Sequence, residues 1–334
     1  MDHARYWRTR SRSPTTRGSP EVVDRESVVD RDRDRNARFN KSNEVNESEP
    51  TKYEVRRFPS IKNLKRTLEE KVEGLLKAGW KYEAMELFLK LSMRGYEPLL
   101  PHDWQLDFDG FPSVLFEPLS EPAYIRNATG SEFRALKALE DIINIGPRVR
   151  DAFELSVQQR TAERVLTDAI NRYALWAFKD GNVNPKTGSM IPIFTTWAGP
   201  GTEAPVKLQS ELARKFRFIA SSWRDAQYFR ANMDQSAEPA QLPTLYGVIV
   251  SEKVFGILTY DIPNEDSMSH IEHIQHMRCV GMFSYDDYAL DVYNGLAIAI
   301  TLIHVRNRMI ELKNEWRSVL EHSMPSTPRP DIDG

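Results

Sequence analysis

The sequence predicts an α+β fold, in which a mixed β-sheet of about four strands is flanked by long helices and preceded by a helical N-terminal region and a disordered arm. Apolar residues recur at three- and four-residue spacing over much of residues 61–178, which is typical of amphipathic helices. Short runs rich in β-branched and aromatic residues then indicate strands between residues 190 and 284. Two of these runs are separated only by Ser251 to Lys253, which predicts an antiparallel hairpin. Helices mixed with strands and one hairpin favour a mixed sheet covered by helices.

Residues 1–57 differ in composition from the rest of the chain. They are rich in arginine, which alternates with aspartate over residues 24–38, and they contain few large aliphatic side chains. The apolar surface that such a segment can bury does not offset the entropy lost on ordering it. We therefore expect residues 1–57 to be a disordered arm, and residues 323–334 to be a disordered tail.

The first part of the arm, residues 4–20, contains arginine and no acidic residue. It resembles an Arg-Ser segment or a nuclear-import patch, so the nucleus is favoured over the cytoplasm. Its charge is consistent with an ordinary solvated tail, or with an electrostatic contact to RNA, DNA or an acidic partner. The residues that would make such a contact are Arg5, Arg8, Arg10 and Arg12.

The overall composition restricts the classes of partner. A net charge of −3 provides no global field that would attract nucleic acid or acidic lipid. The single cysteine, Cys279, excludes a disulfide within the chain, fits a reducing intracellular compartment, and is expected to be a buried structural thiol. The apolar run from Val292 to Ile303 is shorter than the roughly 20 residues that span a bilayer. We expect it to be a buried helix, and we expect no membrane partner.

Residues 58–160 are predicted to be helical, with an irregular aromatic wrap over residues 96–128. Residues 129–132 match a capping box that would start the third helix. The inward face of this helix is predicted from its three- and four-residue spacing to carry Phe133, Leu136, Leu139 and Ile143. The predicted helices of this region are 61–77, 81–93, 131–144 and 147–156.

Residues 161–322 are predicted to form the α+β core. The stripe of its first helix that faces the core is predicted to carry Leu166, Ile170, Tyr173 and Ala177. Pro192 indicates that the first strand lies at a sheet edge or begins near the proline, because proline cannot donate a ladder hydrogen bond. The predicted elements are helix 161–178, strand 190–197, helix 205–229, strands 244–250, 254–260 and 277–284, and helix 287–320.

Three histidines, His270, His273 and His276, form a candidate metal site. On a helix they would lie within about 120° of one another and could face one metal ion. Zinc sites usually draw ligands from more than one element, and no matching Cys or His pattern occurs elsewhere in the chain. A solvated, pH-sensitive loop is therefore the favoured interpretation, and metal binding is the alternative.

Helix 205–229 has a basic face on which Lys207, Arg214 and Lys215 could contact nucleic-acid phosphates. Solvated helix faces routinely have this composition, so a solvated face is the favoured interpretation. The helical hairpin within residues 79–98 also resembles a single pentatricopeptide RNA-binding unit. No second copy is present, although that family works by stacking many units.

Several phrases resemble a family of filamentous-fungal proteins of unknown function over about residues 95–310. They are RGYEPLLPHDW, YIRNATGSEFRALKALEDI, RYALWAFKD, LPTLYGVIVSEKVFGILTYD and DVYNGLAIAITLIHVRN. Part of this region, residues 190–260, is similar to PD-(D/E)xK nuclease-like domains in its order of elements. That resemblance implies a metal-binding aspartate on one strand and an acid-x-lysine on the next. Thr195 and Trp197 stand at the acid and lysine positions, and neither supplies the required charge.

We therefore expect a non-catalytic, fungal-type, nuclear interaction protein with a degenerate nuclease-like core, a protein partner and no cofactor. Nucleic acid could be a further partner through the arm. One alternative is a metal-dependent nuclease or other hydrolase that holds Mg²⁺ with Glu163, Asp168 and Asp180. A second alternative is an RNA-associated factor that uses the arm and the helical hairpin. The sequence does not predict an oligomeric state.

Overall fold

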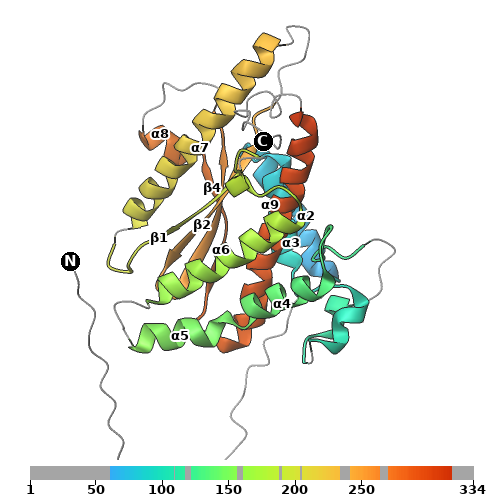
Figure 1. Ribbon diagram of the computed structural model, residues 1–334. Helices are drawn as coiled ribbons and strands as arrows, with labels where there is room; N and C mark the ends of the chain where they lie inside the picture. Colours follow the sequence, from blue (N-terminus) through green and yellow to red (C-terminus); the bar gives the residue numbers. More distant parts are fainter. Residues whose placement is uncertain are drawn as a thin grey trace, which may run out of the picture. The chain divides into compact units, whose positions relative to one another are not determined.

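The computed structural model describes residues 61–108, 110–116, 122–155, 161–187, 190–203, 205–233, 241–263 and 270–317. All of them belong to one compact unit, which extends from Pro59 onward. The predicted arm and tail, and with them Arg5, Arg8, Arg10 and Arg12, lie outside the described residues. Within these ranges the predicted α+β class is confirmed, because long helices cover a four-stranded mixed sheet (Figure 1).

The sheet has the strand order β1-β2-β3-β4. Strands β1 (Phe194–Ala198) and β2 (Thr244–Ser251) are parallel and are connected through helix α7 (Pro205–Met233). Strands β3 (Val254–Asp261) and β4 (Met277–Ser284) continue the sheet in antiparallel order. The hairpin predicted at Ser251 to Lys253 is confirmed, and Glu252 turns it with a left-handed φ of 51°.

Side chains alternate across the sheet and so define its two covered faces. On one face, Phe194 packs edge-to-face on Phe178 of α6 (Ala162–Asp180), and Tyr246 packs on His304 of α9 (Asp291–Glu315). On the other face, Gly247 lies under helix α7, where an added Cβ would be 2.6 Å from the ring of Phe216. Helices α6 and α9 therefore cover one face of the sheet, and α7 covers the other (Figure 1).

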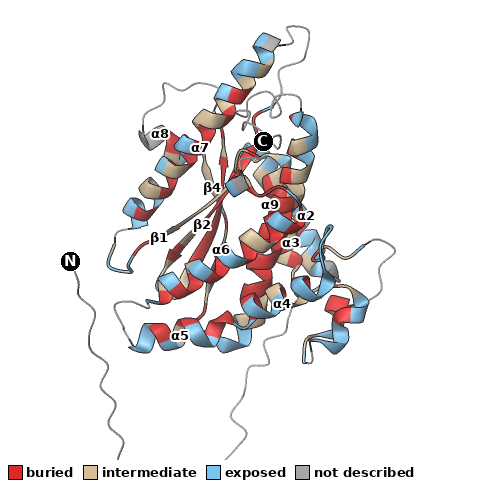
Figure 2. Cartoon of the chain, viewed as in Figure 1, coloured by how far each residue is buried: buried red, intermediate tan, exposed pale blue. Residues whose placement is uncertain are grey.

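Three of the N-terminal helices, α3 (Tyr82–Met93), α4 (Glu132–Ile143) and α5 (Ile145–Leu155), pack onto the same core as the sheet. Helix α2 (Ile61–Lys77) packs against α3. A single cluster of buried side chains contains Leu87 and Leu139 together with Ile170 and Ile300. Figure 2 shows this buried interior continuing from α4 through α6 to α9. The predicted boundary at residue 160 thus falls between two helices, α5 and α6 (Ala162–Asp180), that share one core.

Helix α9 is the central core helix of the described part. The predicted buried run from Val292 to Ile303 lies in it, and all its residues from Asn294 onward are buried. Residues 288–315 are long and apolar enough to cross a membrane by length and composition alone, but 67% of the most apolar window is buried in the protein. Core helices pass the same test, so this composition follows from the position of α9 in the core.

Helix α4 begins differently from the sequence prediction. Ser131 is its N-cap, and no side chain caps it. The members of the expected capping box have other partners: the Thr129 hydroxyl donates to the Asp180 carbonyl, and the Glu132 carboxylate accepts from the Trp104 indole. The capping-box prediction was therefore wrong, because tertiary contacts of these polar groups replace the local ones.

Two predicted core residues lie at the surface. Phe133 was expected to face inward, but its side chain is 75% exposed, and Ala135 and Ile142 are buried beside Leu139 instead. Cys279 was expected to be buried, but it is exposed on β4, which pairs only with β3 among the described strands. Partial desolvation raises the pKa of the Cys279 thiol, which disfavours the nucleophilic thiolate.

Candidate binding cleft between α4 and α6

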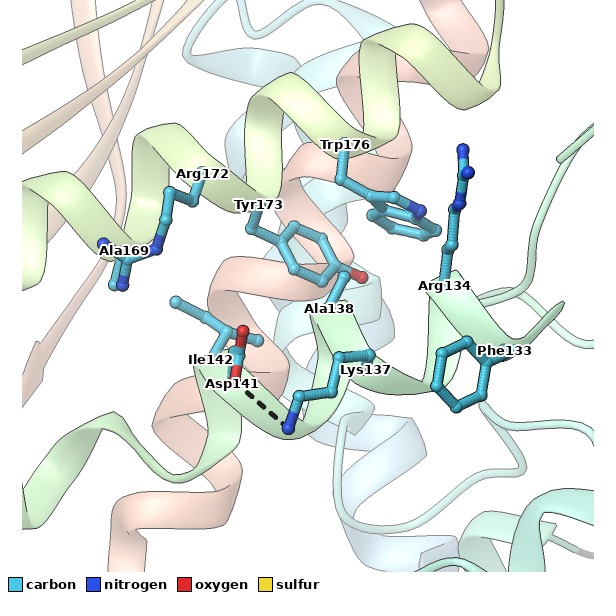
Figure 3. Close-up of a pocket in the computed structure, with 10 residues that line it drawn as sticks. All are labelled: Phe133, Arg134, Lys137, Ala138, Asp141, Ile142, Ala169, Arg172, Tyr173 and Trp176. Atoms are coloured by element: carbon cyan, nitrogen blue, oxygen red, sulfur yellow. Dashed lines mark ion pairs between the residues drawn. The ribbon is translucent and has the colours of Figure 1, made fainter. Parts of the chain in front are cut away.

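A cleft with a volume of about 290 Å³ lies between helices α4 and α6 (Figure 3). Each wall follows the same helical spacing of i, i+3, i+4 and i+7, which places four side chains on one face of each helix. The wall from α4 consists of Arg134, Lys137, Ala138 and Asp141, flanked by Phe133 and Ile142. The wall from α6 consists of Ala169, Arg172, Tyr173 and Trp176.

The floor of the cleft is aromatic. Tyr173 is only 2% exposed, and its ring centroid lies 5.0 Å from that of the half-buried Trp176 at an interplanar angle of 59°. The methyl groups of Ala138 and Ala169 are too small to fill the space between the helices. Burial raises the pKa of the Tyr173 hydroxyl, which therefore stays protonated. This hydroxyl has no hydrogen-bond partner among the described residues.

Two of the three cations at the cleft are not neutralised. Lys137 is held by Glu140 at 2.9 Å and by Asp141 at 3.7 Å. Arg134 and Arg172 form no side-chain hydrogen bond and no ion pair among the described residues. Figure 3 shows Arg134 beside Trp176 and Phe133, and Arg172 on the opposite side of Tyr173. The cleft thus combines the exposed ring of Phe133 and the buried and half-buried rings of its floor with two uncompensated guanidinium groups.

A buried ion pair fixes the walls of the cleft relative to each other. Asp180, the last residue of α6, is 2.9 Å from Arg306 of α9, and both side chains are 3% exposed. The Asp180 carboxylate also accepts hydrogen bonds from the backbone N–H groups of Ala128 at 2.6 Å and Gly130 at 2.8 Å. Because these two residues directly precede α4, the carboxylate ties the start of one wall to the end of the other.

The opposite end of α4 is held by close contact with α9. A Cβ added to Gly295 would lie 2.5 Å from the Cα of Ile143 and 3.0 Å from the Ile142 carbonyl oxygen. Only glycine permits this approach without a shift of one helix. The two contacts, at Asp180 and at Gly295, leave α4 little freedom to close the cleft.

The structure does not bring together the acids proposed for a hydrolase site. Glu163 accepts a hydrogen bond at 3.1 Å from the backbone N–H of Glu252 in the β-hairpin. Asp168 is exposed and lies 3.9 Å from Arg164, whereas Asp180 is buried. All three acids are on α6, and at 1.5 Å per residue its two ends lie about 25 Å apart. They therefore cannot hold one metal ion.

A second cleft, with a volume of about 380 Å³, lies beside β1, where the nuclease resemblance would place its charged residues. Its described lining includes Thr195 and is uncharged except for Lys186. Trp197 faces α7, where the Lys215 ammonium lies 5.0 Å from the centre of the indole and donates to the Thr196 carbonyl at 2.6 Å. No carboxylate lines this cleft among the described residues.

The predicted histidine site is divided between core and surface. Residues 270–275 form helix α8 (His270–Gln275), so the expectation of a solvated loop was wrong. His273 is buried, and its Nδ1 is 2.7 Å from the Tyr260 hydroxyl, while the half-buried His276 packs edge-to-face on the same ring. The His270 side chain lies outside the described residues. Within the part that the structure describes, no group of three His, Cys, Asp or Glu residues could hold a metal ion.

The predicted basic face of α7 is locally neutralised. Lys207 pairs with Glu203 at 2.6 Å, and Arg214 pairs with Glu211 at 2.8 Å. Burial lowers the pKa of Lys215, whose ammonium is directed toward the edge of β1. These three residues therefore do not form the patch of free cations that a phosphate backbone would attract.

Sequence reasoning missed the residues that distinguish the α4–α6 cleft. Phe133 was assigned to the core, and Arg134, Arg172 and Trp176 were not assigned to any site. Each helix by itself has an ordinary polar face, and the cleft exists only because two such faces meet. The spacing of Arg134 to Asp141 and of Ala169 to Trp176 is the only local signal, and it is shared by many surface helices.

Comparisons of the chain with protein-family models, with curated proteins and with solved structures found no match. The resemblances to a fungal family and to nuclease-like domains therefore stay predictions.

Proposed function

We propose that this chain is a non-catalytic interaction protein, and that the α4–α6 cleft receives an apolar anchor side chain from a protein partner. The observation that carries the proposal is the exposed ring of Phe133 beside a cleft with an aromatic floor. Interface hot spots are enriched in tryptophan, tyrosine and arginine around a pocket that excludes water. The lining of the cleft contains all three residue types, and the lining residues of each helix span about two turns.

Binding fits the side chains of the cleft better than hydrolysis does. Its only described carboxylate is Asp141, which lies 3.7 Å from Lys137 and is exposed. A hydrolytic site needs a base or metal-bound water next to a group that stabilises developing charge. The described lining supplies aromatic rings and cations, which favour recognition.

The test is a selection of binders from a random peptide library on the full-length protein. We expect peptides with one large apolar residue, whose binding is lost in Phe133→Ala and in Trp176→Ala. Phe218→Ala is the matched control, because Phe218 lies on α7 and is 77% exposed, close to the exposure of Phe133. Binders that are lost equally in the Phe218 variant, or the absence of any cleft-dependent binder, would refute the proposal.

We also propose that the Arg-Ser segment of residues 4–20 directs the protein to the nucleus. The support is its run of arginine without acidic residues. A fluorescent fusion with Arg5, Arg8, Arg10 and Arg12 changed to serine should move from nucleus to cytoplasm. The matched control changes Arg25, Arg31, Arg33 and Arg35, each of which follows an aspartate. Equal redistribution of both variants, or none, contradicts the assignment.

A further inference from the structure

We infer that the partner segment is acidic, with a carboxylate on each side of the apolar anchor that enters the α4–α6 cleft. This inference rests on the proposed function and adds the chemistry of the partner. The argument starts from the two guanidinium groups, Arg134 and Arg172, which have no partner among the described residues. The third cation, Lys137, is already paired.

The placement of the two arginines matches a ligand with charge at both ends. Arg172 precedes Trp176 by one helical turn, which corresponds to about 6 Å along α6. Arg134 stands beside Trp176 on the facing wall, so the aromatic floor lies between the two guanidinium groups (Figure 3). An anchor ring on Tyr173 and Trp176 would therefore have a cation near each flanking residue.

The side chains at the cleft favour carboxylates as the anionic groups. Each guanidinium is a planar fork that can bind a carboxylate through two parallel hydrogen bonds. Arg134 and Arg172 are both exposed, so the carboxylates of a partner can reach them from solvent. The two unpaired guanidinium groups can therefore bind one carboxylate each.

A nucleic acid fits this surface less well. Its affinity comes from many phosphate contacts, commonly six to ten by order of magnitude, and from a surrounding positive field. Helix α4 carries three carboxylates near its two basic residues, Asp141 in the cleft wall and Glu132 and Glu140 outside it, and the chain has a net charge of −3. Those carboxylates would repel a continuous phosphate backbone, whereas a short acidic peptide can keep its charges at Arg134 and Arg172.

The experiment uses three acetylated tripeptide amides with a central tryptophan, flanked by two glutamates, two glutamines or two lysines. Binding to the full-length protein is measured by titration calorimetry at low and at high salt. We expect the glutamate peptide to bind at least about tenfold more tightly than the glutamine peptide, and the lysine peptide to bind most weakly. The preference should shrink in high salt, because exposed charges are screened.

Arg134→Gln and Arg172→Gln should each reduce the preference for glutamate over glutamine several-fold while leaving the glutamine peptide little changed. Arg148→Gln is the matched control, because Arg148 is exposed on α5 and lies outside the cleft. Trp176→Ala should weaken the glutamate and glutamine peptides alike. A single-stranded oligouridylate is titrated in parallel, and we expect it to bind more weakly than the glutamate peptide.

Each failure has a distinct signature. If the glutamate and glutamine peptides bind equally and both depend on Trp176, the apolar cleft stands and the acidic partner is refuted. If neither peptide binds in a Trp176-dependent way, the proposed function fails together with the inference. If the oligouridylate binds best and depends on Arg134 and Arg172, nucleic acid replaces protein as the partner.

Discussion

The Asp180 carboxylate is fully occupied by partners within the protein, although the sequence made it a candidate catalytic acid. It accepts from the backbone N–H groups of Ala128, Thr129 and Gly130 and from Arg306. Burial lowers the pKa of Arg306, because desolvation disfavours its charged form. The loss of one partner would leave the other charge buried and uncompensated.

We predict that Asp180→Asn destabilises the protein by about 3–5 kcal/mol, the cost of breaking a buried ion pair. Urea unfolding followed by circular dichroism measures the free energy of unfolding. Asp168→Asn is the matched control, because Asp168 lies on the same helix but is exposed, and should change stability by at most about 0.5 kcal/mol. Similar losses in the two variants would show that the Asp180 pair is not the anchor that we describe.

At the scale of elements, one residue of another helix sets how closely the C-terminal end of α4 packs. Gly295 lets α9 approach the backbone of α4, and α4 supplies one wall of the cleft. A larger side chain at this position must move α4 away from α9. The cleft and the core should therefore respond together to a change at Gly295.

We predict that Gly295→Ala lowers the free energy of unfolding by about 1–3 kcal/mol, the usual cost of overpacking a core. It should also weaken peptides that bind the cleft, because α4 is displaced. The comparison is Gly74→Ala in α2, where nothing lies within 4 Å of the added Cβ and alanine should stabilise the helix by about 0.5–1 kcal/mol. An unchanged free energy of unfolding in Gly295→Ala would mean that the α4–α9 contact accommodates the added methyl group.

At the scale of the whole molecule, the spacing of apolar residues predicted the helices and strands better than it predicted which of them pack together. The α6 stripe of Leu166, Ile170, Tyr173 and Ala177 is buried as predicted. The first strand was expected from residue 190 but begins at Phe194, after Pro192, since proline cannot join the ladder. Such features depend only on residues close together in the chain, so they can be predicted from the sequence.

Contacts between distant segments were not predictable from one sequence. Phe133 satisfies the same spacing as the buried Leu139, yet it lies at the cleft because α9 packs against a different side of α4. Likewise, the partners of Asp180 come from residues about 50 and 126 positions away in the chain. Local spacing contains no information on these pairings, so the cleft could not be anticipated.

His304 joins three parts of the molecule through a buried hydrogen-bonded chain. Its Nδ1 lies 3.2 Å from the hydroxyl of Tyr124, which precedes α4, and its Nε2 lies 3.0 Å from the hydroxyl of Tyr246 on β2. Desolvation, with a smaller effect of the nearby charge of Arg308, lowers the pKa of His304 from 6.5 to about 4. The folded protein therefore contains the neutral imidazole at physiological pH.

We predict that, because of His304, the free energy of unfolding falls as the pH is lowered from 6.5 to about 4. In that window the unfolded chain binds a proton that the folded chain does not, so the free energy of unfolding rises with pH. The difference between the two pKa values corresponds to a loss of about 3 kcal/mol on going from pH 7 to pH 4. His304→Gln keeps hydrogen-bonding groups but does not titrate. Urea unfolding at both pH values should therefore show a smaller loss in the variant, and parallel losses would exclude His304 as the origin.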